Sequence, residues 1–431
     1  MKVVDCVAKK LTVGFGLAVI AVAFTAVNLR AGISSLAPVI GQVADSFGVS
    51  NSTAGILTSL PGFCFAIMGW SAVPIARRLG LSPTLVAGSV ALLVGLAIRP
   101  FVNSYWPFLL LTVLLIAGIA VANILLPAWV KEHSQGTHQV RLMMIYTAVL
   151  GASGAVGPLS ALLFSGSSAW RWSLGVWVVP VVVQVVVWAI VLSRTKKDVP
   201  SAGVMPDPEA LAEEFENAEN EPAKTLPAQP VSDPGGSLIK SPTAIAMMLF
   251  FGIQSSGAYA QMGWLPAILV ESGVSEAIAS IALAVLGGFN VIGGVLMPWL
   301  LSRLKSVVSL PVILGVVTAG GWLGVMFAPT AAPLVWASML GVGGMCFPLA
   351  LALLTARTRS PLVTARLSGF VQPGGYIIAG IVPLLMGFLY SATGTWDAAL
   401  ILVTVMSLAL IVFGVRAARN VFIDDELARQ Q

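Results

Sequence analysis

An arginine interrupts the first long apolar run of this chain, at residue 30. The segment NLRAGISSLAP, residues 28–38, lies inside a run from about residue 11 to residue 41 that otherwise carries no charge. Burying a guanidinium group in hydrocarbon costs about 2.5 to 3.5 kcal/mol on insertion scales, so an embedded arginine normally faces a cavity or a partner. If the span ended at Leu29, Arg30 would instead extend to the interface, but residues 31–41 contain no charge. We therefore predict that Arg30 is embedded and is the central functional residue.

No acidic residue of the sequence is placed to balance this charge within the spans. All 18 Asp and Glu residues lie in the termini, in the central loop or at span ends, the closest being Asp45, Glu132, Glu271 and Asp397. An anionic substrate would supply the missing counter-charge through charge-assisted hydrogen bonds. Proton relays generally use embedded Asp, Glu or His, and both histidines lie in one loop. The pattern favours small-anion transport, and a proton-coupled drug or metabolite antiporter is the alternative.

Further polar side chains occur within the apolar runs. Each one alone is explained by a hydrogen bond between helices, but their distribution over five runs favours one shared polar cavity. Pro127 removes a backbone donor, which frees the carbonyl of Asn123 four residues earlier. We predict that the substrate site is drawn from Arg30, Asn28, Asn123, Gln254, Tyr259, Gln261, Asn290, Gln372 and Tyr376.

The composition predicts that these residues lie on membrane-spanning helices. Apolar residues make up 57% of the 431 residues and charged residues only 10%, and the mean hydropathy is +0.94, which excludes a soluble protein of this length. Runs of about 20 apolar residues cross the ~30 Å hydrocarbon core as helices. Twelve such runs are predicted, at about 11–41, 54–76, 82–102, 106–130, 140–164, 172–193, 243–270, 276–301, 306–328, 332–356, 362–391 and 396–415.

Lysine and arginine set the orientation, because they accumulate in cytoplasmic loops. Outside the central loop, fifteen lie on the side of the N-terminus and two, Arg99 and Arg171, on the other. Both termini are therefore expected in the cytoplasm, with Arg99 extending outward to the interface. The N-terminal lysines before an apolar run imitate a signal peptide, but the run is too long, and we predict an uncleaved first span. The net charge of +5 then reflects topology, and no nucleic-acid partner is expected.

A change of composition divides the spans six and six. Residues 194–241 are rich in Pro and Glu and poor in aromatics, which predicts a disordered cytoplasmic linker with at most a short helix around 208–219. The predicted units are a six-helix bundle at 1–193, the linker, a six-helix bundle at 242–418 and a cytoplasmic tail at 419–431. The halves echo each other, since Gly48-Val49-Ser50 and Gly273-Val274-Ser275 are each followed by a proline and a basic end. Such repeats are typical of transporters whose halves rock about a central site.

Four motifs carry a family resemblance over nearly the whole chain except the linker. NLRAGISSLAP, PIARRLG, ANILLPAWVK and LSGFVQPGGYIIAGIVP resemble the major facilitator superfamily and, more narrowly, its cyanate/nitroimidazole porters. The resemblance implies an all-α rocker-switch carrier for small anions or heterocycles, with a site lined by Arg30, Asn28, Asn123, Gln372 and Tyr376. The sequence lacks the acidic residue that the superfamily carries before the basic pair Arg77 and Arg78. We expect these two arginines and Arg303 to act in gating.

The same residues set limits on other functions. A membrane enzyme needs a positioned acid, base, nucleophile or metal set, and no such constellation occurs, so no enzyme, cofactor or metal is predicted. Three scattered cysteines offer no disulfide framework. A non-transporting sensor is a remote alternative, without a recognisable output domain. We expect a monomeric multi-pass protein of the cytoplasmic membrane that moves a small solute by alternating access, with co-movement of a proton left open.

Overall fold

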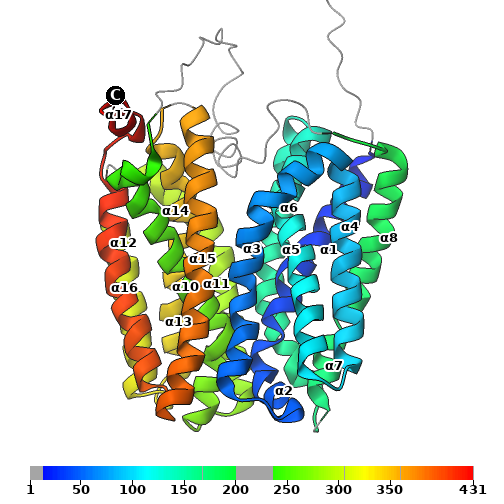
Figure 1. The fold of residues 1–431 in the computed structure, drawn as a ribbon, viewed down its shortest axis with the longest axis vertical. Coiled ribbons are helices and arrows are strands. Elements are labelled where there is room, and N and C mark those ends of the chain that lie inside the picture. Colours follow the sequence, from blue (N-terminus) through cyan, green and yellow to red (C-terminus); the bar gives the residue numbers. More distant parts are fainter. Residues whose placement is uncertain (1–12, 167, 200–235, 305, 360, 431) are drawn as a thin grey trace, which may run out of the picture.

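The computed structural model describes residues 13–166, 168–199, 236–304, 306–359 and 361–430, and in these ranges it is helical without strands. Two helical halves stand side by side (Figure 1). Residues 200–235 of the predicted linker, including the short helix proposed around 208–219, fall outside the described residues. Its two ends are structured, contrary to the prediction of disorder from 194 to 241, since residues 194–195 belong to a helix and Leu238–Lys240 form a helical turn. The first half contains α1 (Phe15–Ser34), η1 (Ala37–Val39), α2 (Ile40–Phe47), α3 (Asn51–Leu79), α4 (Leu81–Ile98), η2 (Arg99–Phe101), α5 (Tyr105–His133), α6 (Thr137–Leu159), η3 (Ser160–Leu163), α7 (Ala169–Gly175) and α8 (Val178–Thr195).

The second half begins with a short turn at the end of the linker and finishes with a short helix beyond the last span. Its elements are η4 (Leu238–Lys240), α10 (Pro242–Glu271), α11 (Glu276–Arg303), α12 (Ser309–Phe327), α13 (Pro333–Gly343), α14 (Cys346–Ala356), α15 (Pro361–Thr393), α16 (Asp397–Ala418) and α17 (Ile423–Ala428). The ends of α8 and α16 and the start of α10 lie at the same end of the molecule (Figure 1), which we call the linker side.

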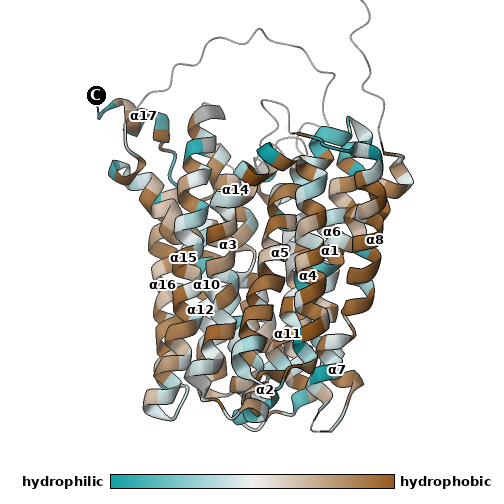
Figure 2. Cartoon of the chain, turned by 45° about the vertical axis from the view of Figure 1, so that its right-hand side comes forward, coloured by the Kyte–Doolittle hydropathy of each residue, from teal (hydrophilic) through white to brown (hydrophobic). Residues whose placement is uncertain are grey.

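Eleven segments of the described chain are long and apolar enough to cross a membrane. They match the predicted runs except for the seventh, which corresponds to α10. That helix has 30 residues, long enough to span, but Gln254, Tyr259 and Gln261 lower the hydropathy of its central part. Hydrophobic residues cover much of the length of the bundle and hydrophilic ones gather at its two ends (Figure 2). The prediction of an all-α, multi-pass membrane fold is therefore confirmed.

The first predicted span is not one continuous helix. It breaks after Ser34 and resumes as η1, with Pro38 in its first turn, before α2 begins at Ile40.

Arg99 packs beside this break and was predicted wrongly as an outward-reaching interface residue. Its side chain is fully buried and donates from Nη2 to the carbonyl of Gly32 at 3.1 Å. A cation is favoured there because the last carbonyl groups of α1 carry partial negative charge.

The two halves repeat each other at the level of turns and caps. Gly48 and Gly273 both have positive φ, +63° and +93°, a conformation that glycine adopts without steric cost. The serine two residues later then caps the next helix in each half, because Ser50 Oγ accepts from the Thr53 amide and Ser275 Oγ from the Ile278 amide. The predicted internal repeat is thus present in local geometry as well as in sequence.

Glycines bring the halves into contact along two helix pairs. On α3 and α15 the paired positions recur every seven residues, Gly55 with Gly387, Gly62 with Gly380 and Gly69 with Pro373. On α6 and α11, Gly154 meets Gly287 so closely that a Cβ on Gly287 would lie 2.5 Å from the Gly154 carbonyl carbon. On the side opposite the linker, Ala37 and Ile40 share a hydrophobic core with Trp264 of the second half. The halves are therefore closed against each other on that side.

Candidate functional site

Arg30 lies at the junction of the two halves, about one turn before the break in α1. Its aliphatic stem runs along the glycine surface of α6, because a Cβ on Gly154 would lie 3.8 Å from Arg30 Cβ and 3.9 Å from Cα of Gly287 in α11. The side chain is half-buried. Among the side chains that the structure describes, no hydrogen bond or ion pair engages its guanidinium group. The predicted position within a span is confirmed, since α1 continues to Ser34.

Three tyrosines from three other helices share the electrostatic environment of Arg30. The guanidinium charge acts on the hydroxyl groups of Tyr146 in α6, Tyr259 in α10 and Tyr376 in α15. All three are half-buried, and they come from both halves of the molecule. α6 belongs to the first half, and α10 and α15 belong to the second. A bound molecule that contacts all three tyrosines therefore bridges the two halves.

One of these tyrosines is oriented by a predicted site residue. Tyr146 donates from its hydroxyl to Asn123 Oδ1 at 2.8 Å, which ties α6 to α5. Tyr376 is set by aromatic neighbours instead, with its ring centroid 5.4 Å from that of Phe65 in α3 and 5.1 Å from that of Phe251 in α10. The Tyr259 and Tyr376 hydroxyls donate to no other described side chain. They are therefore available to a bound molecule.

Two other residues predicted for the site lie in different surroundings. Gln372 is half-buried on α15, one turn before Tyr376, and donates to Ser368 Oγ at 2.7 Å. Asn28 is 2% exposed and belongs to a polar chain inside the first half, donating to Gln184 Oε1 at 2.8 Å while Gln184 donates to Ser89. Asn28 thus joins α1 to α8 and α4, which is a packing role. The Asn290 side chain is not among those described.

The two predicted glutamines of α10 do not lie with the tyrosines. Gln254 and Gln261 line a separate cavity inside the second half. Gln254 is five residues before Tyr259 and Gln261 two after it, which turns both side chains by roughly 140° to 160° away from Tyr259 around the helix. The basic residues predicted to act in gating, Arg77, Arg78 and Arg303, are exposed in the last turns of α3 and α11.

Sequence reasoning missed Tyr146, Phe65 and Phe251. A signal for Tyr146 was present, since the chain has only five tyrosines and tyrosine in membrane proteins gathers at the interfaces. Tyr146 is nine residues from the start of α6 and thirteen from its end, far from either interface. The two phenylalanines give no such signal, because an apolar side chain within a span has many places to pack.

The site contains donors and no described acid. The guanidinium group offers five N–H donors in a planar fork, and the Tyr259 and Tyr376 hydroxyls add two. The rings of Phe65 and Phe251 pack against Tyr376 at its border. Such an arrangement suits a small molecule that carries negative charge or strong acceptors.

Comparison with known proteins identifies the scaffold. The family model described as Major Facilitator Superfamily matches residues 19–361. The chain belongs to this superfamily. The transporter is 29% identical over 400 residues to the 2-nitroimidazole transporter of Escherichia coli K12, covering 92% of this chain and 93% of that one. It is 25% identical over 378 residues to the cyanate transport protein CynX of the same organism, covering 86% and 88%. The predicted resemblance to these porters is confirmed.

Solved structures show the same fold. The D-xylose-proton symporter superposes with a TM-score of 0.73 at 12% identity, covering 96% of this transporter and 99% of the symporter. A bacterial homologue of the lysosomal transporter Spinster, described as inward-facing and occupied, gives a TM-score of 0.70 at 16% identity, covering 95% and 97%. The protein is a secondary transporter of small solutes, and its spans place it in a membrane.

Proposed function

We propose that the transported solute is a small anion and that Arg30 binds its charge. The observation that supports this proposal is the Arg30 guanidinium at the junction of the halves, without a hydrogen bond or ion pair to any described side chain. A charge in this position is costly unless it is paired. The relatives named for cyanate and for 2-nitroimidazole carry small solutes, of which cyanate is an anion. A cyanate-like anion or a small heterocycle with strong acceptor atoms fits the same donors.

In this proposal both halves contribute residues to the anion site. Arg30 and Tyr146 belong to the first half, and Tyr259 and Tyr376 belong to the second. An anion held by Arg30 and by the two free hydroxyls draws both halves together, and this bridging favours the occluded state over the open ones. Asn123 holds Tyr146 in place, and Gln372 lies one turn from Tyr376 as a further polar contact. Rocking of the halves then exposes the anion alternately to the two sides.

Orientation and assembly are part of the same proposal. The charge count of fifteen lysines and arginines against two supports cytoplasmic termini, with the linker side in the cytoplasm. Arg77, Arg78 and Arg303 then lie at the cytoplasmic ends of α3 and α11, where a gate between the halves opens and closes. We propose that a monomer is the transporting unit, because the site lies within one chain.

Arg30 variants test the anion site in proteoliposomes loaded with a panel of small anions and neutral heterocycles. Arg30→Lys keeps the charge but loses the planar fork, and Arg30→Gln loses both. Removing a charge-assisted contact of about 1.5 to 3 kcal/mol should weaken apparent affinity by about tenfold to a hundredfold in Arg30→Lys, and Arg30→Gln should lose more.

A matched control is Arg171→Lys, because Arg171 donates to the carbonyl oxygens of Pro100 and Val102 away from the site. This variant should transport normally. Anion affinity unchanged in both Arg30 variants would refute the anion site and make a neutral substrate the better hypothesis. Transport that depends on a pH gradient and is abolished by one of Asp45→Asn, Glu132→Gln, Glu271→Gln or Asp397→Asn would favour the proton antiporter instead.

A further inference from the structure

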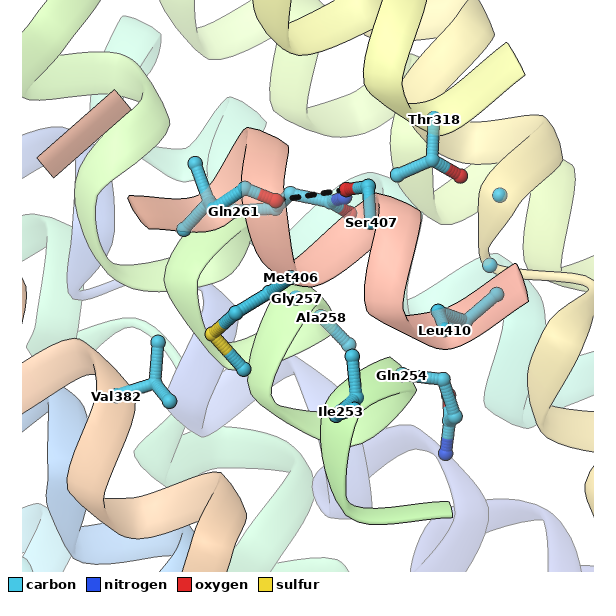
Figure 3. A pocket seen from close by; sticks show the side chains of 13 residues that line it. Ile253, Gln254, Gly257, Ala258, Gln261, Thr318, Val382, Met406, Ser407 and Leu410 are labelled. Atoms are coloured by element: carbon cyan, nitrogen blue, oxygen red, sulfur yellow. Dashed lines mark hydrogen bonds between the residues drawn. The ribbon is translucent and has the colours of Figure 1, made fainter. Parts of the chain in front are cut away.

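A small cavity lies inside the second half, on the face of α10 that points away from Tyr259. Residues of α10, α12, α13, α15 and α16 line it, with Gln254, Gln261, Thr318 and Ser407 as its polar side chains (Figure 3). The cavity has a volume of about 30 Å³, which is room for one or two water-sized ligands. The exposed fractions of these four side chains lie between 4% and 7%, so the polar lining is buried within the bundle.

The hydroxyl groups in this cavity offer only acceptor lone pairs. Ser407 Oγ donates its proton to the Val403 carbonyl at 2.8 Å, and Thr318 Oγ1 donates to the Leu314 carbonyl at 2.7 Å. Each hydroxyl has a single proton, so neither has one left for a ligand. Gln254 donates one amide N–H to Ser255 Oγ at 2.6 Å, and its carbonyl oxygen is an acceptor that no described donor occupies. Gln261 has no hydrogen-bond partner among the described residues although it is 94% buried.

The backbone at the cavity wall adds partial negative charge. α13 ends at Gly343, and the chain turns through Gly344 and Met345 before α14 begins at Cys346. Both Gly343 and Gly344 line the cavity. The amides of Gly344 and Met345 already donate to the carbonyl oxygens of Leu340, Gly341 and Val342. Of the last four carbonyl groups of α13, that of Gly343 alone accepts from no described amide, and interrupted helices of transporters commonly present such groups to bound cations. Side chains and backbone therefore favour the same kind of ligand.

We propose that this cavity binds a small monovalent cation, Na⁺, through neutral oxygen ligands. The ligands are the amide oxygens of Gln254 and Gln261, the hydroxyl oxygens of Ser407 and Thr318, and the carbonyl end of α13. Hard cations prefer such oxygen donors, and the acceptor character of the hydroxyls disfavours an anion. Water alone in the cavity is the competing occupant.

The position of this site links it to transport. α10 presents Gln254 and Gln261 to the cavity and Tyr259 to the Arg30 site, so one helix is shared by both. Occupancy of the cavity restrains the rotation of α10 and thereby sets the orientation of Tyr259. This coupling step rests on the proposed anion transport, whereas Na⁺ binding itself does not. Co-movement of Na⁺ with an anion would also leave little net charge to cross the membrane.

Thermal unfolding of the purified protein in detergent tests Na⁺ binding without any substrate. NaCl, KCl and choline chloride are compared at equal ionic strength for the wild type, Ser407→Ala and Gln261→Leu. A ligand that binds only the folded state raises the unfolding midpoint in a saturable way, so we expect a rise in Na⁺ that is absent in choline. Both variants should lose that rise. Two variants are used so that the test still holds if one of them fails to fold.

The matched control is Ser338→Ala, since Ser338 donates to the Leu334 carbonyl at 2.7 Å as Ser407 does to Val403, but on the exposed face of α13. Ser338→Ala and Arg30→Gln should both keep the Na⁺ response, and the second separates this site from the anion site. Equal midpoints in Na⁺ and choline for the wild type would overturn the proposal and leave water as the occupant. An undiminished Na⁺ response in Ser407→Ala and Gln261→Leu would overturn it as well, because the ion would then bind elsewhere.

Discussion

Replacing Gly62 by alanine should shift the transporter toward conformations in which α3 and α15 are separated. A Cβ on Gly62 would lie 2.5 Å from Cα of Gly380 and 2.9 Å from the carbonyl oxygen of Tyr376. Both are backbone atoms, so no change of rotamer can relieve the contact. Ordinary contact begins at 3.4 Å, and the Gly380 amide nitrogen lies nearer still than its Cα, so the helices would have to move apart by about 1 Å.

The size of the effect follows from the cost of overpacking. Inserting a methyl group into a well-packed contact costs about 1 to 3 kcal/mol. Only conformations in which the halves are closed on the side opposite the linker bear this cost. The equilibrium between closed and open states on that side should therefore shift by about 5-fold to about 150-fold toward opening.

The reaction of an introduced cysteine with a membrane-impermeant thiol reagent measures this shift. Thr58 is 7% exposed and packs against Gly263 of α10 in the second half. Thr58→Cys, in a background without Cys6, Cys64 and Cys346, should react only when the halves separate. Its rate should rise in Gly62→Ala by a factor within the range given above.

Two further glycines provide graded controls. A Cβ on Gly69 would meet Pro373 Cγ at 3.9 Å, and one on Gly380 would meet the Phe63 ring at 3.1 Å. Gly69→Ala should therefore leave the labelling rate unchanged, and Gly380→Ala should raise it slightly because a side chain can yield. A rate in Gly62→Ala equal to that in Gly69→Ala, with both proteins monodisperse, would refute the steric argument.

Two other predictions concern the C-terminal helix α17 and the membrane topology. Burial alone would raise the pKa of Glu426 in α17, but hydrogen bonds from Ser241, Thr243 and Arg416 outweigh it and hold the pKa below its ordinary value. A lowered folded-state pKa stabilises the fold above the unfolded-state pKa, and this contribution is lost as the pH falls through the folded-state value. Glu426→Gln should therefore lower the unfolding midpoint at neutral pH, with a difference from the wild type that narrows in acid; a constant difference would contradict this. Reporter fusions after Ser201 and after Gln431 should both be cytoplasmic, and one external reporter would mean that the number of spans between the two sites is odd.

Much of the fold was predictable because each span is a local property of the sequence. A run of about 20 apolar residues has one stable solution in a bilayer, a helix that satisfies its own backbone. The predicted runs and the observed helices therefore agree, including α10, whose polar residues lower its hydropathy. The repeated turns at Gly48 and Gly273 were also visible in the sequence, since the same residues recur at the same place in each half.

The candidate site was predictable only where a residue was costly in its own surroundings. Arg30 stood out because a charge in an apolar run needs a partner, and its position within α1 is as expected. Asn28, two residues earlier, looked like part of the same site but hydrogen-bonds to Gln184 of α8. Arg99 looked like an interface residue because a helix end and a proline follow it, yet it is fully buried against the end of α1.

The sequence by itself determined the class of the protein, the order of its spans, the internal repeat and the embedded charge at Arg30, because hydropathy, periodicity and charge act over a few helical turns. The tertiary structure alone decided that Tyr146 joins Tyr259 and Tyr376 around Arg30, and that Gln254 and Gln261 face a different cavity. Which side chains meet depends on the rotation of each helix about its own axis. It is set by glycine contacts such as Gly154 with Gly287, between residues far apart in the chain that no local pattern connects.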